Sequence, residues 1–255
     1  MKCENCGNEY APSGDDSRCP FCGQIPGMNI GTAGKEAYGA DKGEARGNCA
    51  WERRSSWFDL QAIIEMIRNV LVDPVATFKQ MKLSGDMASP LVFVLVLGSI
   101  GVIVSLFWNI VLEGFQYLPF RRGAEAFVIS TGMKIVFMVF SPVLVLIGTF
   151  IGAGILHISL LITGGEKNGF EATFRVVAYS SGATALFQIL PVCGGFIGGI
   201  WAIVAQIIGA REMHETTTGK AVLAVLLPLI CCCGCIIALS VFFGLGAFFI
   251  HNATR

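Results

Sequence analysis

Charged residues are scarce in this sequence of 255 residues, and the scarcity is uneven. Asp, Glu, Lys and Arg make up 14% of the chain, against about 25% in ordinary soluble domains. Residues 1–89 carry ten of the 18 basic and 12 of the 18 acidic residues, so the other 166 residues carry only 14 charges. The sequence therefore divides into a polar amino-terminal part and a long apolar body, and the body does not have the composition of a soluble domain.

Residues that would support catalysis or nucleic-acid binding are also scarce. The chain has three histidines and no His-Glu-x-x-His, Gly-x-Ser-x-Gly or phosphate-loop motif, so we expect no enzymatic activity. The net charge is zero, whereas nucleic-acid binding requires a basic patch, so nucleic acid is not an expected partner. No apolar run follows Met1, as a secretory signal peptide would require. We therefore expect the amino terminus to stay in the compartment of synthesis.

Four long stretches contain no Asp, Glu, Lys or Arg at all. They are residues 87–112, 135–165, 176–210 and 221–254. A helix needs about 20 apolar residues to cross the hydrocarbon core of a bilayer, and each stretch is longer than that. The sequence therefore predicts an all-α integral membrane protein, a bundle of five transmembrane helices in contact with membrane lipid.

The third uncharged stretch is too long for one helix, and Pro191-Val-Cys-Gly-Gly195 interrupts it near its centre. Helices tend to end just before a proline. We predict a short helical hairpin here, which either crosses a thinned part of the bilayer or is re-entrant and covered by protein. The predicted spans are about 89–112, 135–163, 175–190, 196–209 and 221–250, and the second and fifth could kink at Ser141-Pro142 and Pro228.

Four cysteines near the amino terminus form two Cys-x-x-Cys pairs, Cys3/Cys6 and Cys19/Cys22, separated by twelve residues. Two such turns can present four thiolates to one tetrahedral zinc ion, with no open position for catalysis. So short a segment cannot bury enough core to fold alone, so the metal would supply the folding energy. We predict a zinc ribbon over residues 1–23 with one structural zinc ion. A pair of disulfides and a redox dithiol are the alternatives.

The predicted zinc ribbon and the basic residues at the ends of the spans together predict the orientation of the protein in the membrane. With the amino terminus inside, six basic residues flank the inner ends and four flank the outer ends. The inner ones are Lys79, Lys82, Lys167, Arg175, Arg211 and Lys220, and the outer ones are Arg121, Arg122, Lys134 and Arg255. Free thiolates suit a reducing cytosol. We predict a multi-pass protein with a cytosolic amino terminus and an external carboxyl terminus, in the cell membrane if the source is a prokaryote.

Residues 24–56 are rich in Gly, Ala and charge, without apolar periodicity. They are expected to form a flexible linker, in which Cys49 has no role. Apolar residues then recur at helical spacing from Phe58 to Leu71, and Asp73-Pro74 would end this helix. The expected amphipathic segment, 57–83, could lie in the membrane interface, or it could pack on the cytosolic face of the bundle.

The sequence resembles the central signature of Yip1-domain membrane proteins in an ordered set of segments. These are Leu156-His157, Gly164-Gly165 and Phe170-Glu171-x-Thr173-Phe174-Arg175-Val176-Val177-Ala178-Tyr179-Ser180, followed by Ile200-Trp201, Ile208-Gly209-x-Arg211-Glu212-x-His214 and Lys220-Ala221-x-Leu223-Ala224. Asp73-Pro74-x-x-Thr77-Phe78 resembles the entry segment of the family, so the resemblance covers about Val72–Pro228. It implies five helical spans and a cytosolic amino terminus. Eukaryotic members are linked to Rab GTPases and vesicle traffic, but a zinc ribbon ahead of the domain is a prokaryotic-style arrangement, so Rab binding is not carried over.

Seven ionisable residues of the body are candidate site residues. His157 lies inside the second predicted span, where it is either a functional group or a neutral side chain that hydrogen-bonds a neighbouring helix. The other six fall on the predicted cytosolic rim: Glu171, Arg175, Arg211, Glu212, His214 and Lys220. Glu171 and Arg175 are four residues apart and should pair on one helical face. The rim residues would anchor helix ends near headgroups, and the alternative is a docking site for a cytosolic partner or an anionic lipid.

Small residues recur within the spans. Gly148-x-x-x-Gly152, Gly194-x-x-x-Gly198 and Gly195-x-x-x-Gly199 have the spacing that lets membrane helices approach closely. Cys231, Cys232, Cys233 and Cys235 cluster in the fifth span. Consecutive helical residues point about 100° apart, so these thiols cannot all face one metal. We expect small apolar filler, with acylation as the alternative near a headgroup layer.

These patterns leave three hypotheses about function. The first is a non-enzymatic scaffold or adaptor, in which the zinc ribbon recruits a cytosolic protein. The bundle, which could form homo-oligomers, would hold this partner at the membrane or act on local lipid organisation and membrane traffic. The second is a small transporter or channel, which requires a polar cavity reaching His157, whereas a tightly packed bundle favours the adaptor. The third, an intramembrane enzyme, would require a nucleophile and a base within hydrogen-bond reach.

Overall fold

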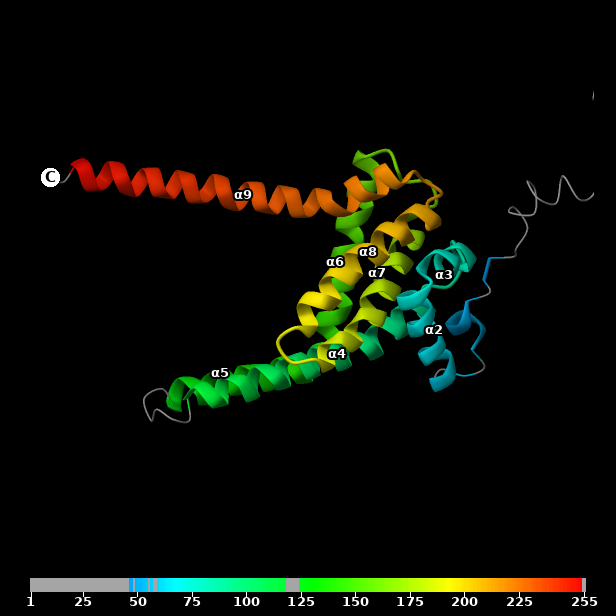
Figure 1. Ribbon diagram of the computed structural model, residues 1–255, viewed down its shortest axis with the longest axis horizontal. Helices are drawn as coiled ribbons and strands as arrows, with labels where there is room; N and C mark the ends of the chain where they lie inside the picture. The colour runs from blue at the N-terminus through cyan, green and yellow to red at the C-terminus, as the bar shows by residue number, and fades with distance from the viewer. Residues whose placement is uncertain (1–45, 48, 55, 57–58, 118–123, 254–255) are drawn as a thin grey trace, which may run out of the picture. The chain divides into compact units, whose positions relative to one another are not determined.

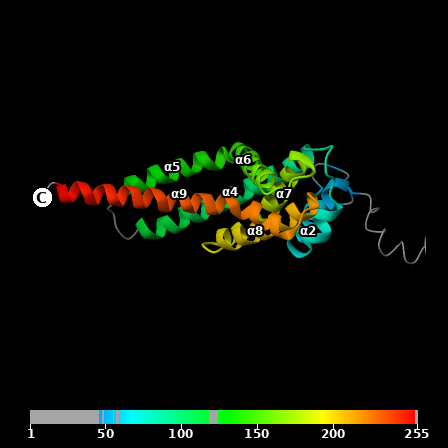
Figure 2. The same ribbon diagram turned by 90° about the horizontal axis from the view of Figure 1, so that it is seen from above.

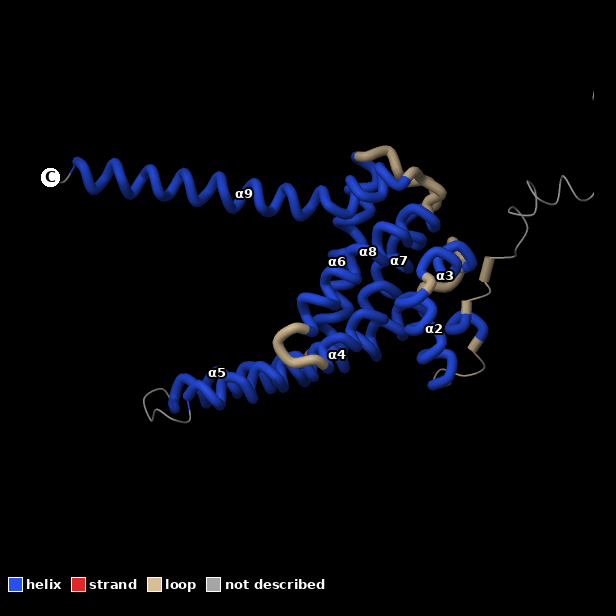
Figure 3. The backbone as a smooth tube through the Cα atoms, viewed as in Figure 1, coloured by secondary structure: helices blue, strands red, loops and turns tan. Residues whose placement is uncertain are grey.

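The computed structural model describes residues 46–47, 49–54, 56, 59–117 and 124–253. The helices of this part are η2 (Ala50–Arg53), α2 (Leu60–Val72), α3 (Pro74–Gln80), α4 (Ala88–Tyr117), α5 (Ala124–Val139), α6 (Ser141–Ile162), α7 (Gly169–Thr184), η3 (Ala185–Ile189), α8 (Gly194–Met213) and α9 (Thr218–Ala253). Both η elements are 3₁₀-helices, and no strand occurs among these residues (Figure 3). The all-α prediction is therefore confirmed for the described residues, and the predicted zinc ribbon at residues 1–23 lies outside them.

Four of the helices are long and apolar enough to cross a membrane: Ala88–Phe115, Ser141–Ile162, Gly194–Met213 and Thr218–Val241. Helix α7 is not among them, because it has 16 residues and carries Arg175 and several hydroxyl groups, yet it is buried along most of its length. Helices α2, α4, α6 and α8 pack around it (Figures 1 and 2). Polar groups at membrane depth are tolerated where protein covers them, so a helix of this composition can occupy the centre of the bundle.

Some helix boundaries differ from the predicted spans. The second predicted span, 135–163, is divided between α5 and α6, because α5 ends at Val139 and α6 begins at Ser141 with a proline in its first turn, where proline is favoured. Helix α5 begins earlier than expected and packs against α4 (Figure 1). Pro228 does not end α9, which continues through it. The hairpin turn lies where the sequence places it, and Val192 within it has a φ of 65°, which is strained for a β-branched residue.

Two short helices connect the amino-terminal part to the first span. Asp59 caps α2 by accepting a hydrogen bond from the N–H of Ala62 at 3.1 Å, and Asp73 caps α3 through the N–H of Ala76 at 3.2 Å. Helix α2 packs on α7 and η2. Its buried residues are Ala62, Met66, Ile67 and Val70. The structure thus shows the amphipathic helix packed on the bundle, with Leu60, Ile64 and Val72 exposed on its other face.

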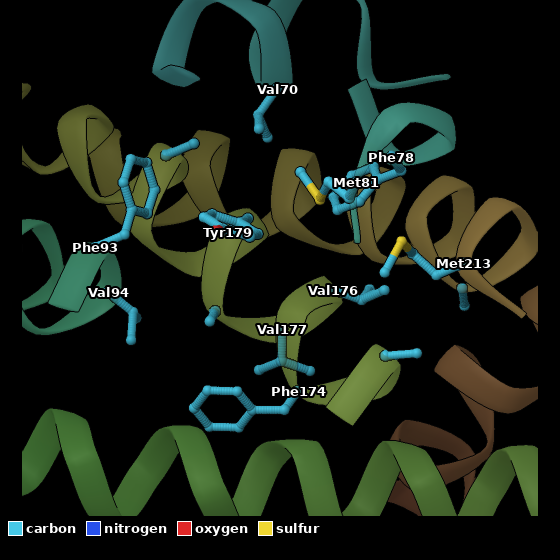
Figure 4. Packing of buried hydrophobic residues seen from close by; sticks show 14 of the residues in the cluster. Val70, Phe78, Met81, Phe93, Val94, Phe174, Val176, Val177, Tyr179 and Met213 are labelled. Carbon is cyan, nitrogen blue, oxygen red and sulfur yellow. The ribbon is translucent and has the colours of Figure 1, made fainter. Parts of the chain in front are cut away.

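The largest buried side chains gather around α7 (Figure 4). The ring of Phe93 lies between those of Trp51 and Tyr179, with centroid distances of 5.8 Å and 5.3 Å. Two glycines allow the helices to approach this closely. A Cβ on Gly182 would lie 2.8 Å from the Phe93 ring, and one on Gly209 would lie 2.8 Å from Val176. The core therefore combines residues of the amino-terminal segment with residues of the bundle.

Among the residues whose burial is described, which end at Val241, helix α9 packs through its first turns. Ala221, Ala224 and Val225 are buried where α9 meets α6 and α8, whereas residues 229–241 are all exposed. The four cysteines at positions 231, 232, 233 and 235 are free and exposed. The sequence led us to expect that these cysteines would fill space in the core of the chain. They do not, because the helix has left the bundle before it reaches them.

Candidate functional site

Arg175 lies at the centre of a buried charge cluster formed with Glu52 and Glu171. It is fully buried on α7, and its Nη1 donates to the carboxylate of Glu52 in an ion pair. Its Nη2 donates to Oε1 of Glu171 at 3.0 Å and to the carbonyl oxygen of Asp86 at 2.7 Å. The expected pairing of Glu171 with Arg175 is therefore present. The guanidinium, however, lies inside the protein and not on an exposed rim.

Glu52 reaches this cluster from η2, 123 residues earlier in the chain. Its side chain is 1% exposed. Oε2 of Glu52 accepts from the backbone N–H of Lys82 at 3.2 Å, and the Tyr179 hydroxyl lies 3.5 Å from Oε1. The neighbouring Trp51 is also buried, and its Nε1 donates to the carbonyl of Ser89 at 2.7 Å. The predicted flexible linker, 24–56, thus ends in a packed stretch, 49–54, which we call the docking segment.

The charges around Arg175 are held by hydrogen bonds. Glu171 accepts hydrogen bonds from Nη2 of Arg175 and from the N–H of Asp86, both at 3.0 Å. Burial raises the pKa of Asp86, but hydrogen bonds from the hydroxyl and N–H of Ser89 outweigh it, so this pKa lies below its usual value. The carboxylate of Asp86 is therefore ionised near neutral pH, and the cluster is held by hydrogen bonds on both sides of the buried guanidinium.

Cys49 is buried beside Glu52 in the docking segment. Burial, followed by the negative charge of Glu52, raises the pKa of its thiol to about 12. Reactive cysteines have a lowered pKa and an exposed sulfur, so Cys49 is inert while the segment stays docked. The thiol of Cys49 can react only when the docking segment has detached. Its modification therefore reports detachment, a use that the sequence did not suggest.

A second polar network joins α6, α7 and the end of α8. Oγ1 of Thr173 lies 3.0 Å from Nδ1 of His157 and 2.9 Å from Nε2 of His214. Two backbone N–H groups, those of Lys167 and Asn168, donate to Nδ1 of His214 at 3.4 Å. That nitrogen therefore carries no proton, and Nε2 of His214 donates to Thr173, whose hydroxyl donates to His157. We call His157, Thr173 and His214 the histidine network.

The protonation of the histidine network follows from its surroundings. Burial lowers the pKa of His214 to about 4, Glu166 opposes this shift and His157 adds to it. A neutral His214 agrees with its acceptor role at Nδ1. His157 hydrogen-bonds a residue of the neighbouring helix α7, which is the packing role that the sequence left open. Thr173 is fully buried between the two histidines, so this hydroxyl is closed to a substrate.

A groove of about 590 Å³ lies between α4, α6, α7–η3 and α8. Seven of its lining residues are glycines: Gly98, Gly101, Gly148, Gly152, Gly195, Gly198 and Gly199. Its polar lining residues are Ser105, Thr149, Ser181, Thr184, Gln188 and Gln206. Among the described residues that line it, none is charged and none is His157. The transport hypothesis required a polar cavity reaching His157, and this groove does not provide one.

The family model of the Yip1 domain matches residues 68–240, which is more than half of the chain. This chain belongs to the Yip1 domain family. No curated protein and no solved structure matches it. The Yip1 domain begins inside α2 and ends inside α9, so it contains Arg175, Glu171 and the histidine network but not Glu52. The buried charge cluster therefore connects the Yip1 domain to the docking segment that precedes it.

The remaining rim candidates of the Yip1 domain do not converge on Arg175. Arg211 pairs with its neighbour Glu212 at 2.5 Å, and Nζ of Lys220 donates to the carbonyl of Gly164 at 2.8 Å. Sequence reasoning assigned no role to Glu52, Asp86, Thr173 or Tyr179. The signals available were Trp51, which directly precedes the charged run Glu52-Arg53-Arg54, and the Yip1-domain signature, which contains Thr173 and Tyr179.

The predicted zinc ligands Cys3, Cys6, Cys19 and Cys22 lie outside the described residues. Within the described ranges, no group of three or more His, Cys, Asp and Glu side chains could hold a metal ion. The zinc site stays a prediction, which depends on the spacing of the four cysteines.

Proposed function

We propose that this protein is a non-enzymatic membrane adaptor of the Yip1 type, whose amino-terminal zinc ribbon binds a protein partner in the cytosol. The observation that carries the proposal is the buried ion pair between Glu52 and Arg175. It attaches the chain that follows the ribbon to the central helix of the bundle. The ion pair holds the end of the predicted linker at the bundle, so a partner bound to the ribbon would stay within the reach of that linker and its local concentration at the membrane would rise.

Several contacts besides the ion pair hold the docking segment. The guanidinium of Arg54 stacks 4.4 Å from the Trp51 ring and donates to the hydroxyl of Ser89 at 2.8 Å. A buried tryptophan removes about 150–250 Å² from water, which contributes about 4–6 kcal/mol at most. A partner that displaced the segment would have to supply a comparable binding free energy, so the docked arrangement is the resting one.

The proposal includes five crossings, with the amino terminus in the cytosol and the carboxyl terminus outside. Helix α7 and η3 together extend about 34 Å, enough for a hydrocarbon core of about 30 Å, and the protein around α7 covers its polar side chains. Cys193, free and exposed in the turn before α8, tests this arrangement. A membrane-impermeant thiol reagent should label Cys193 from outside intact cells, and labelling only after permeabilisation would contradict the third and fourth crossings, those of α7–η3 and α8.

The ribbon would bind one zinc ion through the thiolates of its four cysteines, which would supply the folding free energy of this short segment. Purified wild-type protein is expected to contain about one zinc per chain, measured by atomic emission. Cys3→Ser should lose it, whereas Cys49→Ser should retain it. Equal zinc contents in all three proteins would contradict the ribbon.

Partner recruitment is tested by crosslinking in intact membranes, followed by identification of the captured proteins. Wild-type protein should give a defined crosslinked partner that Cys3→Ser loses. Arg175→Met should weaken capture if attachment of the head matters, and Arg68→Met, at an exposed position on α2, is the matched control. If Cys3→Ser and Arg175→Met both capture the same proteins as the wild type, the adaptor proposal is wrong.

A further inference from the structure

Helix α2 has an apolar flank beside the face that packs on the bundle. Successive side chains of an α-helix turn by about 100°, so Leu60, Ile64 and Leu71 fall within about 40° of one another. Leu60 is 66% exposed and Ile64 is 57% exposed, whereas Leu71 is half-buried. We call these three residues the outer flank of α2. The helix therefore carries more apolar surface than the bundle covers.

The bundle and the docking segment cover two other sides of α2. Val70, on the buried face, points toward Tyr179 of α7 (Figure 4). Glu65 and Asn69 line a polar cavity of about 220 Å³ together with residues of the docking segment. Asn69 lies about 160° around the helix from the outer flank, so the docking segment covers the side opposite to it. The outer flank is therefore left without cover by the described part of the chain.

Contacts made just before and just after α2 in the chain place it at one end of the membrane spans. Trp51 of the docking segment packs against Phe93, which lies five residues, or about 8 Å, inside the span that α4 provides. A Cβ on Gly209 would lie 3.1 Å from the ring of Phe78 on α3, and Gly209 is four residues, or about 6 Å, from the end of α8. Because α2 packs on η2, α3 and α7, it runs along the level of these terminal turns.

This level is the boundary between headgroups and hydrocarbon. The hydrocarbon core of a bilayer is about 30 Å thick and the whole bilayer about 40–45 Å, so each headgroup layer is about 5–8 Å deep. A helix in this boundary buries its apolar side about 5–10 Å deep and keeps its polar side in water. Helix α2 has both sides, because an exposed polar side adjoins the outer flank. The residues of this polar side are Gln61, Glu65 and Arg68.

We propose that the outer flank of α2 lies in the headgroup layer of the membrane, with Leu60 and Ile64 against the upper part of the acyl chains. Exposed apolar side chains of α4 begin about one turn further in, with Val96 and Ile100, so lipid surrounds the protein at this level. The docking segment, on the opposite side of α2, is thereby held at the surface that faces water. This contact requires neither the zinc ribbon nor a protein partner.

A photoreactive side chain in the full-length protein tests the contact. Benzoylphenylalanine replaces Ile64 in protein that is reconstituted in vesicles of phosphatidylcholine and phosphatidylglycerol, and mass spectrometry after irradiation identifies what is attached to it. The same replacement at Glu65, one residue further along and on the polar side, is the control. Replacement at Ile237, which is 64% exposed on the span of α9, gives the level expected for full contact with lipid.

We expect lipid adducts at Ile64 at about the level of Ile237 and about tenfold above the level of Glu65. Lipid adducts no more frequent at Ile64 than at Glu65 would overturn the proposal. Attachment of position 64 mainly to protein, whether residues 1–45 of the same chain or a second copy, would overturn it as well.

Polar substitutions provide a matched pair of variants without a photoreactive group. Ile64→Ser should speed hydrogen exchange of the α2 amides in these vesicles by about fivefold or more, because the helix loses part of its contact with lipid. Val72→Ser is the control, because Val72 is 74% exposed and lies about 100° from the outer flank. It should change the exchange rate by less than about twofold. Equal exchange rates in the two variants would overturn the contact of the outer flank with lipid.

Discussion

Replacing Arg175 with methionine, which has a similar length and no charge, perturbs the buried charge cluster directly. Glu52 would keep the Lys82 N–H at 3.2 Å, the Tyr179 hydroxyl at 3.5 Å and its hydrogen bond with the Cys49 thiol, none of which carries a positive charge, while its side chain stays 1% exposed. Breaking a buried ion pair from one side costs about 3–5 kcal/mol. Glu52 can avoid this cost by returning to water, so the docking segment should detach while the bundle stays folded. The detached population should rise on the order of 10²–10⁴-fold.

Cys49 measures that population. It is 4% exposed and its pKa is raised to about 12, so N-ethylmaleimide should modify it only after detachment. When detachment is fast and reversible, the labelling rate is proportional to the detached fraction. Mass spectrometry of the Cys49 peptide separates this thiol from the other nine cysteines.

Glu52→Gln is the matched comparison for Arg175→Met. Arg175 then keeps Glu171 and the carbonyl of Asp86, so we expect a cost of about 1–2 kcal/mol and labelling only about tenfold faster than in the wild type. The double variant with methionine at both positions should label more slowly than Arg175→Met, because no unpaired charge stays buried. If Arg175→Met labels within about threefold of the wild type, the cluster does not hold the segment.

Three further predictions concern the bundle. Gly182→Ala should destabilise the bundle by about 1–3 kcal/mol, because the new Cβ would lie 2.8 Å from the Phe93 ring. At Gly148 a new Cβ would meet nothing within 4 Å, so Gly148→Ala should be neutral or stabilise the bundle by up to about 1 kcal/mol. Thermal unfolding in detergent compares the two variants. The pKa of His214 is about 4 in the folded protein against an ordinary 6.5. The contribution of neutral His214 to the free energy of unfolding is therefore fully present above pH 6.5. It is lost as the pH falls towards 4, which lowers the free energy of unfolding by about 3 kcal/mol at most. His214→Gln should flatten this dependence between about pH 7 and about pH 4.5, and an unchanged slope would count against the network. Thr173→Val should cost about 1–3 kcal/mol in the same unfolding assay, because both histidines lose their hydroxyl partner.

The sequence predicts the apolar helices well, because a span that faces lipid must be apolar over about 20 residues and charge-free stretches are visible directly. It predicts α7 less well. The predicted span begins at Arg175, because charged residues normally mark the end of a span, whereas the helix begins at Gly169. Arg175 is neutralised by carboxylates inside the protein, so it does not have to lie at the membrane surface. Such neutralisation depends on packing, which local composition does not show.

In the candidate site too, the sequence predicts some contacts and misses others. The pairing of Glu171 with Arg175 follows from a separation of four residues along one helix. Glu52 could not be found, because 123 residues separate it from Arg175 and η2 has only four residues, too few for a periodic pattern. The histidine network likewise depends on three helix ends that meet only in the folded chain.

The order of synthesis gives the docking segment a further consequence. Glu52 leaves the ribosome 123 residues before Arg175, which at about 5–20 residues per second is a delay of about 6–25 s. During that time Glu52 has no guanidinium with which to pair. A chain whose central helix fails to insert therefore keeps an unpaired carboxylate next to Trp51, and the docking segment stays accessible to chaperones and proteases. Closure of this end of the molecule thus marks a chain whose central helix has reached its place.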